Sequence, residues 1–356
     1  MIKGTFIKVL KRTVIFFGKI ISNFLLGQNK NISEIEKVFV LHLYPQGIGD
    51  LVMLSPLFNN LKISFPGKKI YIVTEQKNIF EDGNFFFISS KLAKLKIKDK
   101  KNSSLIISPT FSLRNLPFLF LCKMYIGYFF SNNLISNISK RPGIYKPSSD
   151  HYYIRAKIII DEICCLTKKE SVYCFPKIKF SNLRDSLGEY ICIAPIARWK
   201  ERQYPIESYI EIIESLAKGI KIILVGDESI YLSKRIALND RIIDFTNKTT
   251  INELCDLLGS SKLFIGNDSG PAHIAIALQV PSIVIFGCVG PNLRVPIDST
   301  HCQENFYFNS GDVCNRFPCF DGFNKPICKN HDKYACIKYI EKEDILNSAQ
   351  EIINKE

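Results

Sequence analysis

The chain has 356 residues, of which 46% are hydrophobic and 23% are charged, a balance that excludes an intrinsically disordered protein. This length exceeds what one ordinary core accommodates, so we expect two domains of about 150 residues each. The net charge of +13 predicts an acidic partner, and charge alone leaves nucleic acid, an anionic membrane surface and a phosphorylated substrate open.

The N-terminal extension, residues 1–36, is basic. Its first 30 residues contain six Lys or Arg and no Asp or Glu, and their apolar stretches are far shorter than the roughly 20 residues that cross a bilayer. We therefore expect a basic amphipathic helix on the anionic cytoplasmic leaflet, which predicts a cytoplasmic protein, peripheral on the inner face of the membrane. A signal peptide and a helix packed on the first domain are the alternatives.

A first Rossmann-like domain is predicted over residues 37–175. The apolar strand 38–43 leads into a glycine turn at 47–49 and then into an apolar helix start at 51–57, which is typical of the opening of a Rossmann-like unit. Further strands at 69–74, 105–108 and 124–128 favour a parallel sheet. Asp50 follows the glycine turn. From its position alone, a role as a helix N-cap and a role in a functional site are equally well supported.

Residues 176–188 lack a clear pattern and are the predicted linker to a second Rossmann-like domain, residues 189–340. Strands alternate there with helices, and Thr250 and Glu253 predict a capping box at the start of one of them. A turn at Gly226 is followed by Asp227 and Glu228, and a carboxylate at this place can bind the two hydroxyls of a ribose.

The stretch 263–273 carries the clearest chemistry of the chain. An apolar strand ends in a tight loop of small and polar residues, and Pro271 then opens a helix, so unpaired backbone N–H groups meet the positive end of a helix dipole. Such a loop suits the phosphates of a ligand. Ser269 and His273 can add donors, Gly270 permits close approach of the backbone, and Asp268 can accept hydrogen bonds from a sugar hydroxyl or orient a neighbour.

The run IGNDSGPAHIA at residues 265–275, followed by Ala277-Leu278, Val280-Pro281 and Phe286-Gly287, resembles the signature of the lipopolysaccharide heptosyltransferase family, glycosyltransferase family 9. The resemblance covers roughly residues 38 to 355. It implies an α/β GT-B fold, in which two Rossmann-like domains hold the ligand in the cleft between them. In GT-B folds the final helix commonly crosses back, so residues 341–356 are expected to return to the first domain.

The same resemblance implies roles for individual residues. The turn Ile48-Gly49-Asp50 with the step Ser55-Pro56 matches the family pattern, which makes Asp50 the expected general base and Gly49 part of the substrate-binding turn. Arg202 stands two residues ahead of Tyr204, at the family position of a phosphate-binding cation.

Glu228 takes the position of the ribose-binding carboxylate, with Asp227 as the alternative. The loop after the strand 190–194 departs from the family pattern, because Pro195 to Trp199 replace its small or hydroxyl residues. Arg198 and Lys200 are therefore alternatives to Arg202.

The function implied by the resemblance is inverting transfer of a heptose from ADP-heptose to the inner core of lipopolysaccharide or another lipid-linked glycan. We expect no metal or other cofactor, because hydrogen-bond donors and cations can neutralise the diphosphate and the chain has no Asp-x-Asp pair. A family member that transfers another sugar and a non-catalytic nucleotide-sugar-binding protein are the alternatives. No nucleic-acid-binding motif is present, so nucleic acid is not an expected partner.

The cysteines divide into two sets. Eight of the twelve are scattered, several of them within apolar runs, as is typical of buried thiols in a reducing compartment. The remaining four form a group with no Cys-x2-Cys pair and no standard zinc-finger spacing, so free thiols are expected there and a structural metal is the alternative. This group is Cys314, Cys319, Cys328 and Cys336.

Overall fold

The structure is a computed structural model, and its described residues form two compact units. The first unit takes the described residues within Met1–Gly47, Leu54–Asn78 and Asp82–Pro176, and the second takes those within Ile48–Met53, Ile79–Glu81 and Lys177–Glu356. The predicted N-terminal helix, Asp227 and Glu228 lie outside the described residues. The described residues are 32–43, 47–99, 103–110, 113–121, 124–127, 135–136, 152–226, 236, 240–296, 304–319 and 326–355.

The first unit is built on a six-stranded sheet with the order β3-β2-β1-β4-β5-β6. Neighbouring strands are parallel except for the antiparallel pair β5 and β6. The order reverses between β1 and β4, as in doubly wound Rossmann-like sheets. The strands are β1 (Lys37–Leu41), β2 (Lys69–Val73), β3 (Phe85–Ile88), β4 (Ser104–Ser108), β5 (Met124–Gly127) and β6 (Ile135–Ser136).

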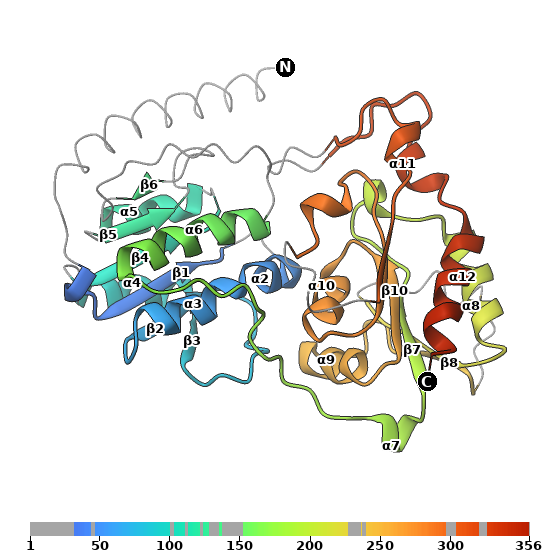
Figure 1. Cartoon of the computed structure of the whole chain (residues 1–356), viewed down its shortest axis with the longest axis horizontal. Helices are drawn as coiled ribbons and strands as arrows, with labels where there is room; N and C mark the ends of the chain where they lie inside the picture. Colours follow the sequence, from blue (N-terminus) through green and yellow to red (C-terminus); the bar gives the residue numbers. More distant parts are fainter. Residues whose placement is uncertain are drawn as a thin grey trace. The chain divides into compact units, whose positions relative to one another are not determined.

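Helices lie on both faces of this sheet, as Figure 1 shows. On one face α4 packs on β2 and on α5, where Phe39, Tyr71 and Phe118 share a core cluster. On the other face α3 packs against α6, and the hydroxyl of Thr167 bonds to that of Ser64 at 3.2 Å. The helices are η1 (Ile32–Glu34), α3 (Pro56–Ser64), α4 (Ser90–Asp99), η2 (Leu113–Asn115), α5 (Leu116–Leu121) and α6 (Tyr152–Thr167).

The second unit repeats this topology. Its six strands follow the order β12-β11-β10-β7-β8-β9, and every neighbouring pair is parallel. Here the order reverses between β7 and β10. The strands are β7 (Tyr190–Ala194), β8 (Lys221–Leu224), β9 (Ile242–Asp244), β10 (Leu263–Asn267), β11 (Ser282–Ile285) and β12 (Asn305–Phe308).

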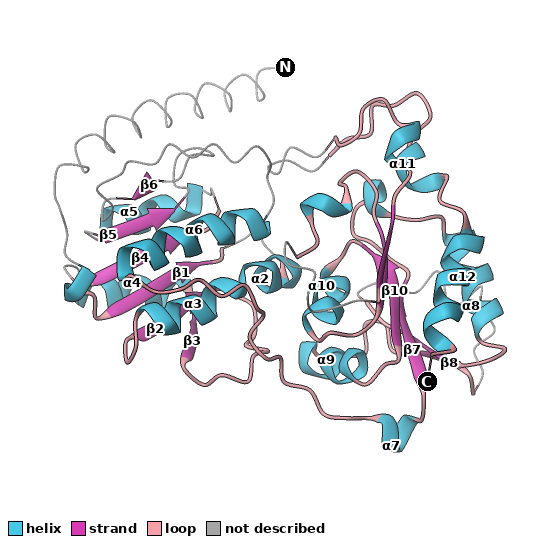
Figure 2. Ribbon diagram, viewed as in Figure 1, coloured by secondary structure: helices cyan, strands magenta, loops and turns pink. Residues whose placement is uncertain are grey.

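The helices of the second unit also flank both faces of their sheet (Figure 2). α9 and α10 pack together on one face, and α8 and α12 on the other. Thr250 and Glu253 form the predicted capping box at the start of α9. The helices are α2 (Ile48–Leu54), α7 (Arg184–Leu187), η3 (Lys200–Arg202), α8 (Ile206–Leu216), α9 (Ile251–Gly259), α10 (Gly270–Ala277), η4 (Pro291–Leu293), η6 (Gly311–Val313), α11 (Ala335–Lys338) and α12 (Lys342–Ile353).

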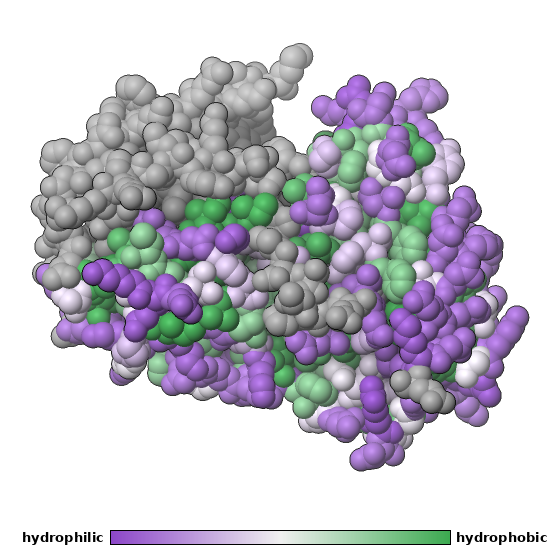
Figure 3. Space-filling model, in the orientation of Figure 1, coloured by the Kyte–Doolittle hydropathy of each residue, from purple (hydrophilic) through white to green (hydrophobic). Residues whose placement is uncertain are grey.

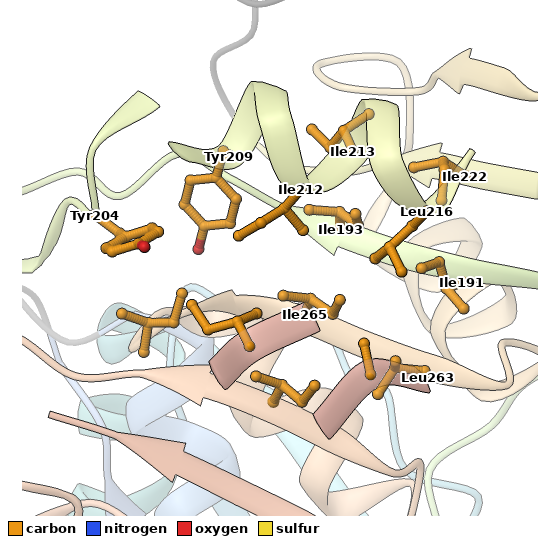
Figure 4. Packing of buried hydrophobic residues seen from close by; sticks show 14 of the residues in the cluster. Ile191, Ile193, Tyr204, Tyr209, Ile212, Ile213, Leu216, Ile222, Leu263 and Ile265 are labelled. Atoms are coloured by element: carbon orange, nitrogen blue, oxygen red, sulfur yellow. The ribbon is translucent and has the colours of Figure 1, made fainter. Parts of the chain in front are cut away.

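The core of the second unit explains the place of α8. Tyr209, Ile212, Ile213 and Leu216 recur at helical spacing, so one face of α8 is apolar and covers the strands that carry Ile193 and its neighbours (Figure 4). The solvent side of α8 and α12 is hydrophilic, which is the purple area at the right of Figure 3. An amphipathic helix buried along one face is therefore what the sequence specifies here.

The C-terminal helix α12 differs from its expected position. Instead of returning to the first domain, it packs on α8, β10 and β11 of the second unit. Ile345, Ala349 and Ile352 lie at i, i+4 and i+7, and this stripe is buried in the core of the second unit. The apolar face of α12 is buried against α8, β10 and β11, whose apolar side chains belong to the same core cluster.

The predicted alternation of strands and helices is confirmed in both units. The apolar helix after the glycine turn is interrupted at Ser55, directly ahead of Pro56, and α2 and α3 are separate helices as a result. Residues 48–53 of α2 group with the second unit. None of the helices in the described part of the chain has the length and apolar character needed to cross a membrane.

Candidate active site

The site lies at the carboxyl ends of β7 and β10, where the strand order of the second sheet reverses, a position that binds ligands in doubly wound folds. Asn267, the last residue of β10, fixes the loop that follows β7. Its side chain accepts a hydrogen bond from the Tyr204 backbone N–H at 3.1 Å and donates one to the Pro195 carbonyl at 3.0 Å. The two loops are therefore held in one arrangement.

Arg202 is the basic residue of the β7 loop that reaches the site. Its Nη1 lies 3.3 Å from Asp268 Oδ2, and its guanidinium stacks 4.5 Å from the centre of the Trp199 ring. Arg198 and Lys200 are exposed. Trp199, which departs from the family pattern, thus supplies a flat surface that orients the guanidinium.

The N-terminus of α10 supplies the hydrogen-bond donors of the site. Ser269 is the N-cap residue in an extended conformation, and its hydroxyl has no hydrogen-bond partner among the described residues. The helix begins at Gly270, so the first N–H groups and the positive end of its dipole lie next to the Ser269 hydroxyl. These groups are suited to an anion.

Asp268 is the buried charge at the centre of the site. Its Oδ2 lies 3.3 Å from Arg202 Nη1 and 3.9 Å from Arg294 Nε, and its Oδ1 lies 3.2 Å from His273 Nε2. Burial alone would raise the pKa of Asp268, but the two guanidinium groups and His273 outweigh it and hold that pKa well below its ordinary value. The carboxylate is consequently ionised throughout the physiological range.

Arg294 is a site residue that the sequence reasoning missed. It follows η4 in the loop after β11, and it is buried with Nη1 3.9 Å from Asp50 Oδ1. An available signal was a basic residue shortly after the apolar run 282–286, which is typical of a strand and follows the stretch 263–273 in the sequence. Since carboxyl ends of parallel strands meet at one edge, Arg294 was placed to join the site.

Gly49 and Asp50 reach the same site because the start of α2 contacts the start of α10. A Cβ atom at Gly49 would lie 2.9 Å from His273 Cδ2 and 3.2 Å from Gly270 Cα, and a Cβ at Gly270 would lie 2.9 Å from Ile48 Cγ2. Both glycines thus permit a close approach of the two helix starts. The structure brings together seven of the eight residues selected from the sequence, namely Gly49, Asp50, Arg202, Asp268, Ser269, Gly270 and His273.

Residues 168–303 match the profile of glycosyltransferase family 9 (heptosyltransferase). The chain carries a glycosyltransferase family 9 domain. This family 9 domain contains β7, β10 and β11 and therefore Arg202, Asp268, His273 and Arg294, whereas Asp50 lies outside the matched segment. The family resemblance and the glycosyltransferase class predicted from the sequence are confirmed.

Similar proteins extend the likeness beyond the family 9 domain. Lipooligosaccharide heptosyltransferase 2 of Campylobacter jejuni is 25% identical over 89% of this chain and 98% of its own length. Lipopolysaccharide heptosyltransferase 3 of Escherichia coli is 24% identical over 67% of this chain and 79% of its own length. The structure of Escherichia coli ADP-heptose heptosyltransferase II has a TM-score of 0.61 at 14% identity and covers 89% of this chain and 98% of that one. The predicted GT-B fold is confirmed.

The cysteine group lies in the segment after the matched profile. Cys314 and Cys336 are buried in one small cluster, Cys328 is half-buried and Cys319 is exposed, and all four are free thiols. Burial, together with the neighbouring Cys314, raises the pKa of Cys336 to about 12, so this thiol stays protonated at neutral pH. Among the described residues no three His, Cys, Asp or Glu side chains are arranged to hold a metal ion.

Proposed function

We propose that this protein is an inverting heptosyltransferase that moves a heptose from ADP-heptose to the inner core of lipopolysaccharide. The observation that carries the proposal is that Arg294 lies between Asp50 and Asp268. Asp268 in turn pairs with Arg202 and directly precedes Ser269, the N-cap of α10. A candidate base and a candidate anion site are therefore close together, as glycosyl transfer requires.

The diphosphate leaving group is assigned to the α10 N-terminus and Arg202. The Ser269 hydroxyl and the first N–H groups of α10 donate hydrogen bonds, and the guanidinium, fixed by Trp199 and Asp268, adds a permanent positive charge. Such preorganised donors stabilise the charge that develops as the glycosidic bond breaks. These residues can do this without a metal ion, and we propose metal-independent transfer.

Asp50 is assigned as the general base. Its carboxylate is about a quarter exposed, which leaves it accessible to an acceptor hydroxyl, and Arg294 lies beside it. When the carboxylate takes the proton of that hydroxyl, the oxygen attacks the anomeric carbon from the face opposite the leaving diphosphate. The configuration at that carbon is therefore inverted.

Asp268 and His273 are assigned to the donor sugar. An ionised carboxylate accepts strong hydrogen bonds from sugar hydroxyls, and its neighbours Arg202 and Arg294 hold it in place. The Nδ1 atom of His273 is buried and has no hydrogen-bond partner among the described residues, and we assign it to a polar group of the donor. Glu228, outside the described residues, is assigned to the ribose.

The substrates are proposed from the relatives. Two of them are named heptosyltransferases of lipopolysaccharide or lipooligosaccharide, and a third is an ADP-heptose heptosyltransferase. We assign residues 189–340 to the nucleotide sugar and residues 37–175 to the acceptor. A lipid-anchored acceptor also fits the positive net charge, and residues 1–30 are assigned to the inner face of the cytoplasmic membrane.

Nucleotide binding tests the donor class. Isothermal titration with ADP, UDP and GDP should give binding of ADP alone, weakened by His273→Ala and by Glu228→Ala. Asp332→Ala is the matched control, since Asp332 is a surface residue paired with Lys338. Preference for UDP or GDP would refute the heptose donor while leaving a family member that transfers another sugar, and absence of nucleotide binding would refute the proposed activity.

A further inference from the structure

The helix α4 of the first unit, labelled in Figure 1, buries one face and exposes two leucines on the other. Ala93 and Ile97, four residues apart, are buried in the core cluster that also contains Tyr71. With 100° per residue, Leu95 therefore lies at the centre of the side that faces solvent. Its side chain is 59% exposed, and that of Leu92 is 41% exposed.

Lysines surround these two leucines. Lys91 and Lys98 lie beside Leu95 on the exposed side, and Lys94 and Lys96 lie at its edges, with Lys96 Nζ 5.5 Å from the centre of the Tyr71 ring. We call the exposed side the α4 face, formed by Lys91, Leu92, Lys94, Leu95, Lys96 and Lys98.

An aromatic side chain extends the α4 face on the neighbouring strand. Phe86 of β3 is 43% exposed, and its ring centre lies 5.4 Å from that of Tyr71, the ring that Lys96 approaches. Phe86 thus adjoins the α4 side of the sheet. Three exposed apolar side chains, Leu92, Leu95 and Phe86, therefore lie on the same side of the sheet, whereas apolar residues exposed singly are common on any surface.

The charge of the α4 face is uniformly positive. The helix contains four lysines and one acidic residue, Asp99, whose Oδ2 lies 3.6 Å from Lys37 Nζ of β1. No Ser, Asn or Gln side chain stands between Lys91 and Lys98, so the face offers apolar contact and positive charge rather than a specific hydrogen-bond pattern. An anionic lipid surface presents the complementary chemistry, an apolar layer beneath phosphate groups.

We propose that the α4 face binds the surface of an anionic membrane, with Leu92, Leu95 and Phe86 entering the headgroup region and the lysines contacting lipid phosphates. The inference rests on the proposed function in one respect: the acceptor of that function is anchored in a membrane, so membrane binding would bring the protein to its acceptor. The contact itself depends on the exposed residues of the first unit and adds a second site to the one assigned to residues 1–30.

Vesicle binding by the full chain tests the proposal. Wild type should cosediment with vesicles of phosphatidylcholine containing phosphatidylglycerol and much less with phosphatidylcholine alone. Lys91→Gln/Lys98→Gln should weaken binding at least tenfold, since each lysine near an anionic surface contributes about fivefold. Leu92→Ser/Leu95→Ser should weaken it at least tenfold as well, because the apolar insertion is lost.

The control is Ile327→Ser/Lys329→Gln, which removes a 72% exposed isoleucine and a nearby lysine in the second unit. Its vesicle affinity should stay within twofold of wild type. Equal affinity of wild type and the α4 variants would overturn the proposal, and so would an equal loss in the control. Retention on DNA with no binding to vesicles would assign the surface to nucleic acid instead and also overturn it.

A transfer assay separates this proposal from the proposed function. The α4 variants should transfer heptose to a deacylated, water-soluble acceptor at the wild-type rate and lose at least fivefold on the same acceptor embedded in anionic vesicles. If wild type transfers no heptose to either acceptor, the proposed function fails, and the vesicle affinities still decide the α4 face. If the α4 variants lose equally on both acceptors, the membrane proposal fails.

Discussion

Arg294 Nη1 lies 3.9 Å from Asp50 Oδ1, which joins a residue of α2 to the loop after β11. The same guanidinium reaches the buried Asp268 with its Nε atom, also at 3.9 Å. Arg294 is thus the cation shared by the proposed base and the carboxylate at the centre of the site. It therefore links Asp268, which lies within the segment that matches family 9, to Asp50, which lies outside that segment.

We predict that Arg294→Met lowers kcat for heptose transfer by about 100-fold, because the Asp50 carboxylate loses the charge beside it and Asp268 loses one of its two arginines. Arg294→Lys keeps a positive charge and should recover at least tenfold of this loss. Arg241→Met is the control, since Arg241 is exposed and bonds to a surface carbonyl. Steady-state kinetics measure kcat for each variant. Turnover of Arg294→Met at the wild-type rate would contradict the role of Arg294 as the cation shared by Asp50 and Asp268.

A matched pair of glycines tests the contact between α2 and α10. Gly49→Ala places a methyl group 2.9 Å from His273 Cδ2, so the helix starts must separate, whereas a Cβ at Gly47 meets nothing within 4 Å. Gly49→Ala should weaken ADP binding and transfer at least tenfold, and Gly47→Ala should change each less than threefold. Titration calorimetry measures ADP affinity, and initial rates measure transfer. Equal affinities and rates for the two variants would exclude the close approach of α2 to α10.

The buried charge of Asp268 predicts a pH dependence of stability. Its pKa is lowered in the folded state, so its contribution is complete above its unfolded pKa of about 4 and is lost as the pH falls toward the folded value. Asp268→Asn should therefore lower the free energy of unfolding by about 3 kcal/mol between pH 5 and 7, because two largely buried guanidinium groups lose their partner. The difference from wild type should shrink below about pH 4.

Denaturant titrations at several pH values measure this difference. Asp332→Asn is the control, because Asp332 pairs with Lys338 on the surface. A difference between wild type and Asp268→Asn that stays constant down to pH 3 would show that folding does not lower the pKa of Asp268.

The β7 loop offers a test of which cation holds the diphosphate. Arg202→Gln should weaken ADP binding by about 10-fold to 100-fold, since Arg202 meets Asp268 and stacks on Trp199. Arg198→Gln removes an exposed charge from the same loop and should change the affinity less than threefold. Titration calorimetry with ADP compares the two variants, and the reverse order of effects would assign the diphosphate to Arg198.

Much of the fold follows from local sequence patterns. Apolar runs bounded by turn residues predict the central strands, and Thr250 with Glu253 predicts the start of α9, because the signals of these elements lie within a few residues of one another. The strand β3 and the helix α4 escaped prediction. β3 has only four residues, and α4 is rich in lysine and has just two buried side chains, Ala93 and Ile97.

The site was predictable where its residues sit next to a strand end or helix start. Ser269, Gly270 and His273 share one strand–loop–helix motif, whose chemistry is visible in the sequence. Arg294 was not predictable in the same way, because its role depends on the packing of α2 within the second unit. The position of α12 depends likewise on which core offers a complementary surface, and the sequence of one helix does not contain that information.

The most direct test of the proposed function is transfer from ADP-heptose to a heptose-deficient lipopolysaccharide core, followed by mass spectrometry and by NMR of the new anomeric centre. Wild type should add heptose with inverted configuration. Asp50→Asn should lower kcat by about 100-fold to 10,000-fold while its affinity for ADP stays within twofold of wild type. Transfer by Asp50→Asn at the wild-type rate, or a product with retained configuration, would contradict the assignment of Asp50 as the base of an inverting heptosyltransferase.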